Sequence, residues 1–228
     1  MNKIIVEVCC ATVYEVQLAA DCGADRIEFN SALEVGGVTP SLAALRLAIK
    51  AAKKTGVEMA VMLRPRGGDF CYNKAEIETM LEDARILTDE GSDYIVYGAL
   101  FADGRINEDL CRQISAECGV PCVFHMAFDE TPDWKTSLDL LVKLNFARVL
   151  TKGCAASAQE GAGVLREMIA YSGNRIQILP GGGVRSNNVR SIIEQTGCSQ
   201  IHFSLKKSPS EILTGQELKS LIDLCKKG

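Results

Sequence analysis

The sequence has few of the features that mark membrane, exported or nucleic-acid-binding proteins. No apolar run reaches the roughly 18 residues that a membrane-spanning helix needs. The first residues lack the charged region, apolar stretch and small-residue cleavage site of a signal peptide. Lysine and arginine together number 25 against 29 acidic residues, so no basic excess favours nucleic acid. These absences predict a cytoplasmic protein with no membrane and no nucleic-acid partner.

Linkers and low-complexity stretches are also missing, and hydrophobic residues make up 47% of the chain. This composition predicts one domain over residues 1–228 with a large core. The ten cysteines include no CxxC pair, only the neighbours Cys9 and Cys10. In a cytoplasmic chain of this length, most cysteines are expected to be reduced and buried as small hydrophobic residues.

Short apolar runs alternate with helical patterns along the whole chain. Glycine or asparagine follows each helical pattern, as at Gly23, Gly91 and Asn145, because these residues adopt the left-handed conformation at little cost. The predicted strands cover residues 4–9, 26–29, 58–63, 94–97, 122–125, 148–151, 176–179 and 200–203. Eight strand-plus-helix units predict a parallel sheet closed into a (β/α)8 TIM-type barrel. A doubly wound open sheet is the alternative, although the expected glycine-rich loop after the first strand is absent.

The segments that follow the strands are longer and more polar than those that precede them, which places the functional face at the carboxyl ends of the strands. Alternation along each strand directs some side chains into the barrel and their neighbours toward the helices. By this parity five polar side chains converge on one pocket: Glu7, Glu28, Arg64, His125 and His202.

These residues have structural and functional interpretations. Buried glutamates need partners, so Glu7 and Glu28 are expected to pair with Arg26 or Arg64. The two histidines, the only ones in the chain, are either satisfied core residues or acid–base groups. Gly181, Gly182 and Gly183 follow the seventh strand, where this fold commonly binds phosphate, with Lys152 and His202 nearby; a tight turn without a ligand is the alternative.

Soft side chains near the same rim suggest a metal. Cys9, Cys71 and Met126 carry the thiol and thioether groups that suit Cu(I). No two of them form a recognised ligand pair, so buried packing of the cysteines is the alternative interpretation.

Five sequence segments together resemble the CutC copper homeostasis proteins. They are GADRIE (23–28), EVGGVTPS (34–41), RPRGGDFCY (64–72), FHMAFDE (124–130) and PGGGV (180–184). The resemblance extends over nearly the whole chain and implies a TIM-type barrel, a cytoplasmic location, a homodimer and a role in copper tolerance with copper binding. It implies no established reaction.

The chain departs from the family pattern near the expected site. Asn30 stands where members usually carry cysteine, Met126 where they carry arginine, and Lys152 where they carry serine. Besides a non-catalytic barrel whose effect on metals is indirect, two functions therefore stay open. The first is copper handling through Cu(I) bound at the barrel mouth. The second is an enzyme acting on a small anionic, phosphorylated or sugar-like metabolite, with Glu7, Glu28, Arg64 and His125 as its catalytic groups.

Overall fold

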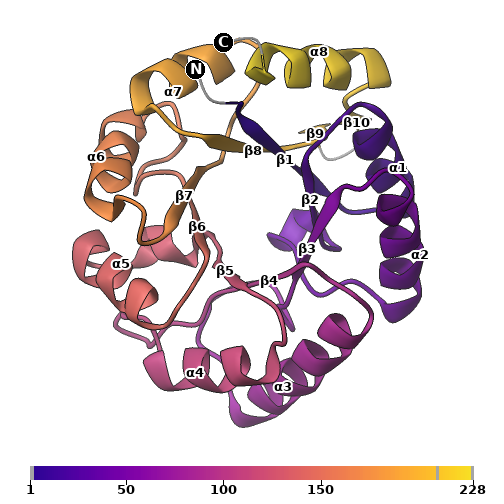
Figure 1. The fold of residues 1–228 in the computed structure, drawn as a ribbon. Helices are drawn as coiled ribbons and strands as arrows, with labels where there is room; N and C mark the ends of the chain where they lie inside the picture. The colour runs from indigo at the N-terminus through magenta and orange to yellow at the C-terminus, as the bar shows by residue number, and fades with distance from the viewer. Residues whose placement is uncertain (1–2, 209–210, 227–228) are drawn as a thin grey trace.

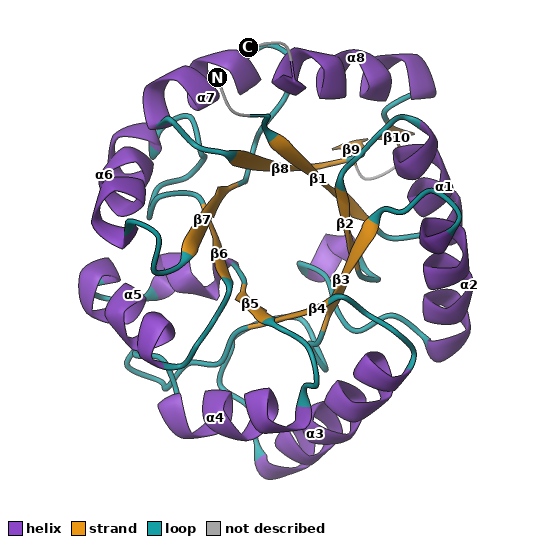
Figure 2. Ribbon diagram, in the orientation of Figure 1, coloured by secondary structure: helices purple, strands orange, loops and turns teal. Residues whose placement is uncertain are grey.

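The computed structural model describes residues 3–208 and 211–226, and its main feature is a barrel of eight parallel strands inside a ring of helices (Figures 1 and 2). The barrel strands are β1 (Ile5–Cys10), β2 (Arg26–Phe29), β3 (Glu58–Met62), β4 (Tyr94–Tyr97), β5 (Cys122–Phe124), β6 (Arg148–Thr151), β7 (Gln177–Pro180) and β8 (Gln200–Ser204). Each begins within one residue of its predicted start, so the predicted (β/α)8 fold is confirmed.

The helices follow the strands in turn. They are α1 (Val13–Asp21), α2 (Leu42–Lys53), α3 (Lys74–Asp89), α4 (Glu108–Glu117), α5 (Trp134–Lys143), α6 (Ala162–Ser172), α7 (Val189–Thr196) and α8 (Gly215–Lys226). Two short 3-10 helices, η1 (Leu33–Val35) and η2 (Met126–Glu130), lie in strand-to-helix loops. A small hairpin of β9 (Lys206–Ser208) and β10 (Glu211–Ile212), which the sequence did not predict, follows β8. Among the described residues, no helix is long and apolar enough to cross a membrane.

Helix starts and buried faces explain the outer ring. At α3, Asn73 and Glu76 form a reciprocal capping box, in which each side chain accepts from the other residue's backbone N–H. The buried face of this helix presents Met80, Ala84 and Leu87 to the barrel. Helical spacing thus gives each helix one apolar side that covers the sheet.

Side chains inside the barrel form layers from alternate strands. The first residues of the four even-numbered strands, which lie at the amino end of the barrel, are Arg26, Tyr94, Arg148 and Gln200. Two positions further along the same strands come Glu28, Val96, Leu150 and His202. Ala60, Met62, Val96 and Val123 form a small apolar cluster separate from the main core. This cluster lies between the polar groups of the two ends.

Backbone hydrogen bonds do not join every pair of neighbouring strands in the barrel. Strands β1 and β8 are paired in parallel, with Glu7 opposite His202. Between residues 177–180 and 200–204 no backbone ladder forms, so β7 and β8 are the two edges of the sheet. A side chain bridges them, because Gln200 donates to Gln177 Oε1 and to the Ile178 carbonyl at 3.3 and 3.4 Å.

Candidate metal site at the barrel mouth

A cavity of about 180 Å³ opens at the carboxyl ends of the strands. Its walls come from six strands or strand ends and from the loops after β2 and β3. The lining residues are Cys9, Glu28, Asn30, Leu33, Gly36, Met62, Arg64, Phe70, His125, Met126, Leu150 and His202. Of the five side chains predicted to converge here, Glu28, Arg64, His125 and His202 line the cavity, and Glu7 lies beneath it.

Three buried side chains at this cavity have the chemistry of metal ligands. One ligand atom each from Cys9, Glu28 and His202 lies within 4.8 Å of the other two. The register of the sheet explains their meeting, because Cys9 pairs with Glu28 on β2 and Glu7 pairs with His202 on β8. A thiol, a carboxylate and an imidazole from three neighbouring strands are therefore held together by the rigid part of the fold.

Asn30 lies beside this group and contacts two of its members. Its Nδ2 donates to Cys9 Sγ at 3.3 Å and to Glu28 Oε1 at 3.2 Å. Asn30 Oδ1 and Glu28 Oε2 are buried and have no hydrogen-bond partner in the described part of the chain. Because an unsatisfied buried oxygen is costly, both atoms are suited to a ligand held among these side chains.

Glu7 supports the group from below. Its Oε1 lies 2.7 Å from His202 Nδ1, and its Oε2 accepts from Nε of Arg26. With Nδ1 engaged by a carboxylate, Nε2 is the nitrogen of His202 that remains for a metal. A carboxylate behind a histidine is the usual way in which proteins orient an imidazole ligand. The expected pairing of Glu7 with Arg26 is thus observed.

The pKa values of this network follow from burial and charge. Burial alone would lower the pKa of His202, but Glu28, Cys9 and Glu7 together raise it well above its usual value. Burial opposes ionisation of Glu7, yet Arg26 and His202 outweigh it and hold the pKa of Glu7 below its usual range. Burial raises the pKa of Cys9 and of Glu28. Without a metal, His202 is a cation and Cys9 a neutral thiol.

His125 faces the same cavity in a different state. Its Nδ1 accepts from the Ala127 backbone N–H at 3.1 Å, and its Nε2 is buried with no partner among the described residues. Burial and the nearby charge of Arg64 lower the pKa of His125 to about 3. His125 is therefore neutral at pH 7, with its proton on Nε2 because Nδ1 is an acceptor.

Arg64 does not reach the glutamates, contrary to the sequence-based expectation. Its guanidinium donates to the carbonyls of Val35, Gly37 and Gly68 at 3.3, 3.2 and 2.6 Å. It also lies 4.6 Å from the ring centroid of Phe70. Arg64 therefore ties together the loops after β2 and β3, whose carbonyl groups accept from its two terminal nitrogens, while its buried Nε has no partner among the described residues.

Of the remaining predicted site residues, some line the cavity and others lie outside it. Met126 lines the cavity, whereas Cys71 lies outside it on the loop after β3. The glycine loop packs against side chains, because a Cβ at Gly181 would meet Leu150 and His202, and one at Gly182 would meet Lys152 and Met126. Lys152 thus covers the glycine loop, and neither contributes to the cavity lining.

Several cavity residues were not recognised from the sequence, among them Phe70 and Leu150. The ring of Phe70 packs against that of His125 in a tilted arrangement, with ring centroids 4.8 Å apart. Leu150 lies in the same layer as His202, and the even-strand spacing that places both would have revealed it.

The fold and this site define a class of protein: a (β/α)8 barrel with a buried group of soft and hard side chains at its carboxyl face that could hold a metal ion. Comparison with known proteins narrows the class. The model of the CutC family matches residues 4–207, so the chain belongs to the CutC family.

Individual relatives agree with this assignment. A CutC family protein of Treponema denticola is 43% identical over 212 residues, covering 92% of this chain and 85% of the relative. The human copper homeostasis protein cutC homolog is 40% identical over 208 residues, covering 91% and 75%. The crystal structure of CutC from Streptococcus agalactiae superposes with a TM-score of 0.84 at 36% identity, covering 88% of this chain and 98% of that one. Phosphoribosylanthranilate isomerase of Thermotoga maritima, at 16% identity and a TM-score of 0.63, shares the fold alone.

Proposed function

We propose that the chain acts in copper homeostasis by binding Cu(I) at the barrel mouth. The observation that carries the proposal is the buried group of Cys9, Glu28 and His202, whose ligand atoms lie within 4.8 Å of one another. The names of the human and streptococcal relatives, which refer to copper homeostasis, support the same ion.

The donors differ in softness, and this difference assigns their roles. The Cys9 thiolate and His202 Nε2 are the ligands that Cu(I) accepts most readily. The thioethers of Met62 and Met126 line the same cavity and extend its soft character. Glu28 and Asn30 supply oxygen atoms, which bind Cu(I) less well. With one thiolate in place of two, the site is suited to an ion that is bound and released.

A cytoplasmic location, a homodimer and a single functional domain belong to the same proposal. All ten cysteines are free, seven of them buried, which agrees with a reducing compartment.

The enzyme hypothesis has less support. Three loop carbonyls hold the guanidinium of Arg64, and Lys152 covers the glycine loop that would cradle an anion. The terminal nitrogens of Arg64 and the Gly181 backbone N–H, which donates to the Thr151 carbonyl, are thus engaged with the protein itself.

A Cu(I) titration tests the proposal. The protein competes with a chromogenic Cu(I) chelator in anaerobic, reducing buffer, and one ion per chain is expected to bind. Cys9→Ser is expected to weaken binding by about tenfold or more, because it removes the thiolate. Cys71→Ser is the matched control, since Cys71 lies outside the cavity. Equal affinity of the Cys9→Ser variant and the unchanged protein would refute the mouth site.

A further inference from the structure

The amino end of the barrel, opposite the mouth, contains buried charge that the copper proposal does not use. Arg26 and Arg148 occupy equivalent positions at the starts of β2 and β6, and both are 3% exposed. Tyr94 lies between them, with the two guanidinium carbons 5.6 and 4.6 Å from its ring centroid. We propose that this end of the barrel is a second binding site, which takes the oxyanion group of a small molecule, a phosphate or a carboxylate, at Arg148.

The two arginines differ in their partners. Arg26 donates to Glu7 and to Gln200 Oε1, and its Nη1 lies 3.5 Å from Glu58. Arg148 donates from Nε to the neutral amide oxygen of Gln177 at 3.2 Å. In the described ranges 3–208 and 211–226, no carboxylate forms a salt bridge with Arg148, and its buried Nη1 has no hydrogen-bond partner.

Arg148 therefore adds a buried positive charge that no salt bridge among the described residues compensates. Glu7 and Glu58 both contact Arg26, whereas Arg148 donates to the neutral amide of Gln177. Burial and the charge of Arg26 lower the pKa of Arg148 below its usual value, which reflects the cost of holding the second guanidinium there. A buried charge is stable when an opposite charge or several hydrogen bonds compensate it. An anion beside Arg148 would supply both.

A cavity of about 310 Å³ lies next to this pair. Its lining residues are Ile5, Asp25, Arg26, Glu58, Tyr94, Arg148, Gln177, Ser199 and Gln200. Two of these are acidic but engaged: Asp25 with Lys3 and Lys226, and Glu58 with Arg26. The exposed amide of Gln177 and the hydroxyl of Ser199 are further donors that suit an oxyanion.

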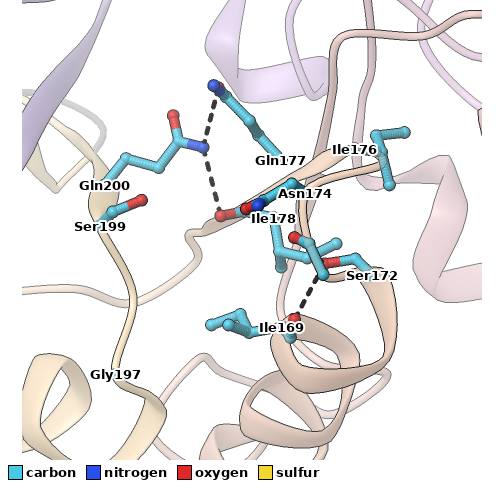
Figure 3. A pocket seen from close by; sticks show the side chains of 10 residues that line it. Ile169, Ser172, Asn174, Ile176, Gln177, Ile178, Gly197, Ser199 and Gln200 are labelled. Atoms are coloured by element: carbon cyan, nitrogen blue, oxygen red, sulfur yellow. Dashed lines mark hydrogen bonds between the residues drawn. The ribbon is translucent and has the colours of Figure 1, made fainter.

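An adjoining cavity of about 430 Å³ gives the site room for more than an inorganic ion. It shares Gln177, Ser199 and Gln200 with the first and continues past Asn174 and Ile178. Figure 3 shows Gln200 and Gln177 directed toward each other on one side of this space, with Asn174 and Ile178 nearby. The oxyanion is expected at Arg148, and the rest of the ligand in the adjoining cavity.

Isothermal titration calorimetry with inorganic phosphate and, separately, with acetate tests the proposal at fixed ionic strength. Saturable one-to-one binding of one or both probes is expected, and the tighter probe identifies the kind of oxyanion. Arg148→Gln is expected to weaken binding by at least about tenfold, since a charged hydrogen-bond donor is lost. Arg112→Gln, which changes an exposed arginine paired with Glu108, is the control and is expected to retain full affinity.

Two further variants keep the test decisive. If Arg148→Gln does not fold by circular dichroism, Gln177→Ala, at an exposed side chain of the same cavity, is expected to weaken the probes severalfold. Cys9→Ser, which alters the mouth, is expected to bind the probes normally, so failure here is distinguishable from failure of the copper proposal. Absence of saturable binding of both probes, or unchanged affinity in the folded Arg148 or Gln177 variant, would overturn the proposal.

Discussion

Glu7 Oε1 and His202 Nδ1 lie 2.7 Å apart in the barrel interior, and this contact links the two ends of the barrel. On one side of it, Glu7 also binds Arg26 at the amino end. On the other, His202 joins Cys9 and Glu28 at the mouth. A single carboxylate thus compensates a structural cation and orients a candidate metal ligand.

The dual role of Glu7 predicts two effects of Glu7→Gln. Unfolding by urea is expected to show a loss of about 3–5 kcal/mol, because buried Arg26 would lose its compensating charge. Cu(I) affinity is expected to fall by roughly 10–100-fold, because His202 would lose its orienting carboxylate. Glu58→Gln is the control: Glu58 also pairs with Arg26 but is 48% exposed, so a loss of at most about 1 kcal/mol is expected. Similar losses in both variants would contradict this account.

Asn30 predicts a gain of function. Asn30→Cys would place a second thiol next to Cys9, where the asparagine Nδ2 now lies 3.3 Å from Sγ. Cu(I) binding is expected to tighten by about tenfold or more, because thiolates suit Cu(I) better than amide oxygens. Asn30→Ser, which changes size without adding a thiol, is the matched control in the same chelator competition. A Cys variant no tighter than the Ser variant would show that position 30 does not contact the ion.

Metal binding is expected to depend on pH. In the free protein Cys9 and His202 each hold a proton, since both have raised pKa values. Both protons must leave when Cys9 Sγ and His202 Nε2 bind the ion, so affinity is expected to rise with pH by up to about tenfold per unit for each proton released. Chelator competition between pH 6 and pH 8 measures the slope (on the order of one to two). In Cys9→Ser the slope is expected to decrease by one proton, and an unchanged slope would remove Cys9 from the ligand set.

His125 predicts a different pH effect, on stability. Its pKa is about 3 in the folded chain against the usual 6.5. Between these values the unfolded chain binds the extra proton, so stability is lost as the pH falls, by about 1.4 kcal/mol per unit. In His125→Gln, the loss between pH 6.5 and 4.5 is expected to be smaller by roughly 2 kcal/mol. Urea midpoints at both pH values measure it; parallel losses in both proteins would show that His125 is not buried as a neutral group.

The sequence predicted the barrel and much of the mouth because both depend on short-range regularities. The glycine and asparagine joints marked the units, and alternation within strands placed Glu7, Glu28 and Cys9 in the interior. The register of neighbouring strands then brought Cys9 and Glu28 side by side. These features repeat along the chain, so they can be read without knowing the tertiary structure.

The contacts that the sequence did not predict depend on loop conformation and on residues that meet across the barrel. Arg64 points to the interior as expected, but its partners are carbonyls of two loops whose course the sequence does not reveal. The contacts of Arg148 with Tyr94 and Gln177 were not predicted, because the three residues lie on three different strands. Asn188 precedes α7 without a side-chain capping bond to it, and instead accepts from the Arg185 backbone N–H and donates to the Gly183 carbonyl. Which of several polar groups a side chain contacts is determined by the tertiary structure and not by the local sequence.

The missing backbone ladder between β7 and β8 affects how the barrel is closed. A fully hydrogen-bonded barrel is held at every strand pair by backbone bonds, whereas the described contacts between β7 and β8 include no backbone ladder. Gly181 and His202 lie at the upper end of that edge, and Gln177 and Gln200 at the lower end. Closure of the barrel along this line at its amino end therefore depends on one side chain, because Gln200 donates to Gln177 Oε1 and to the Ile178 carbonyl.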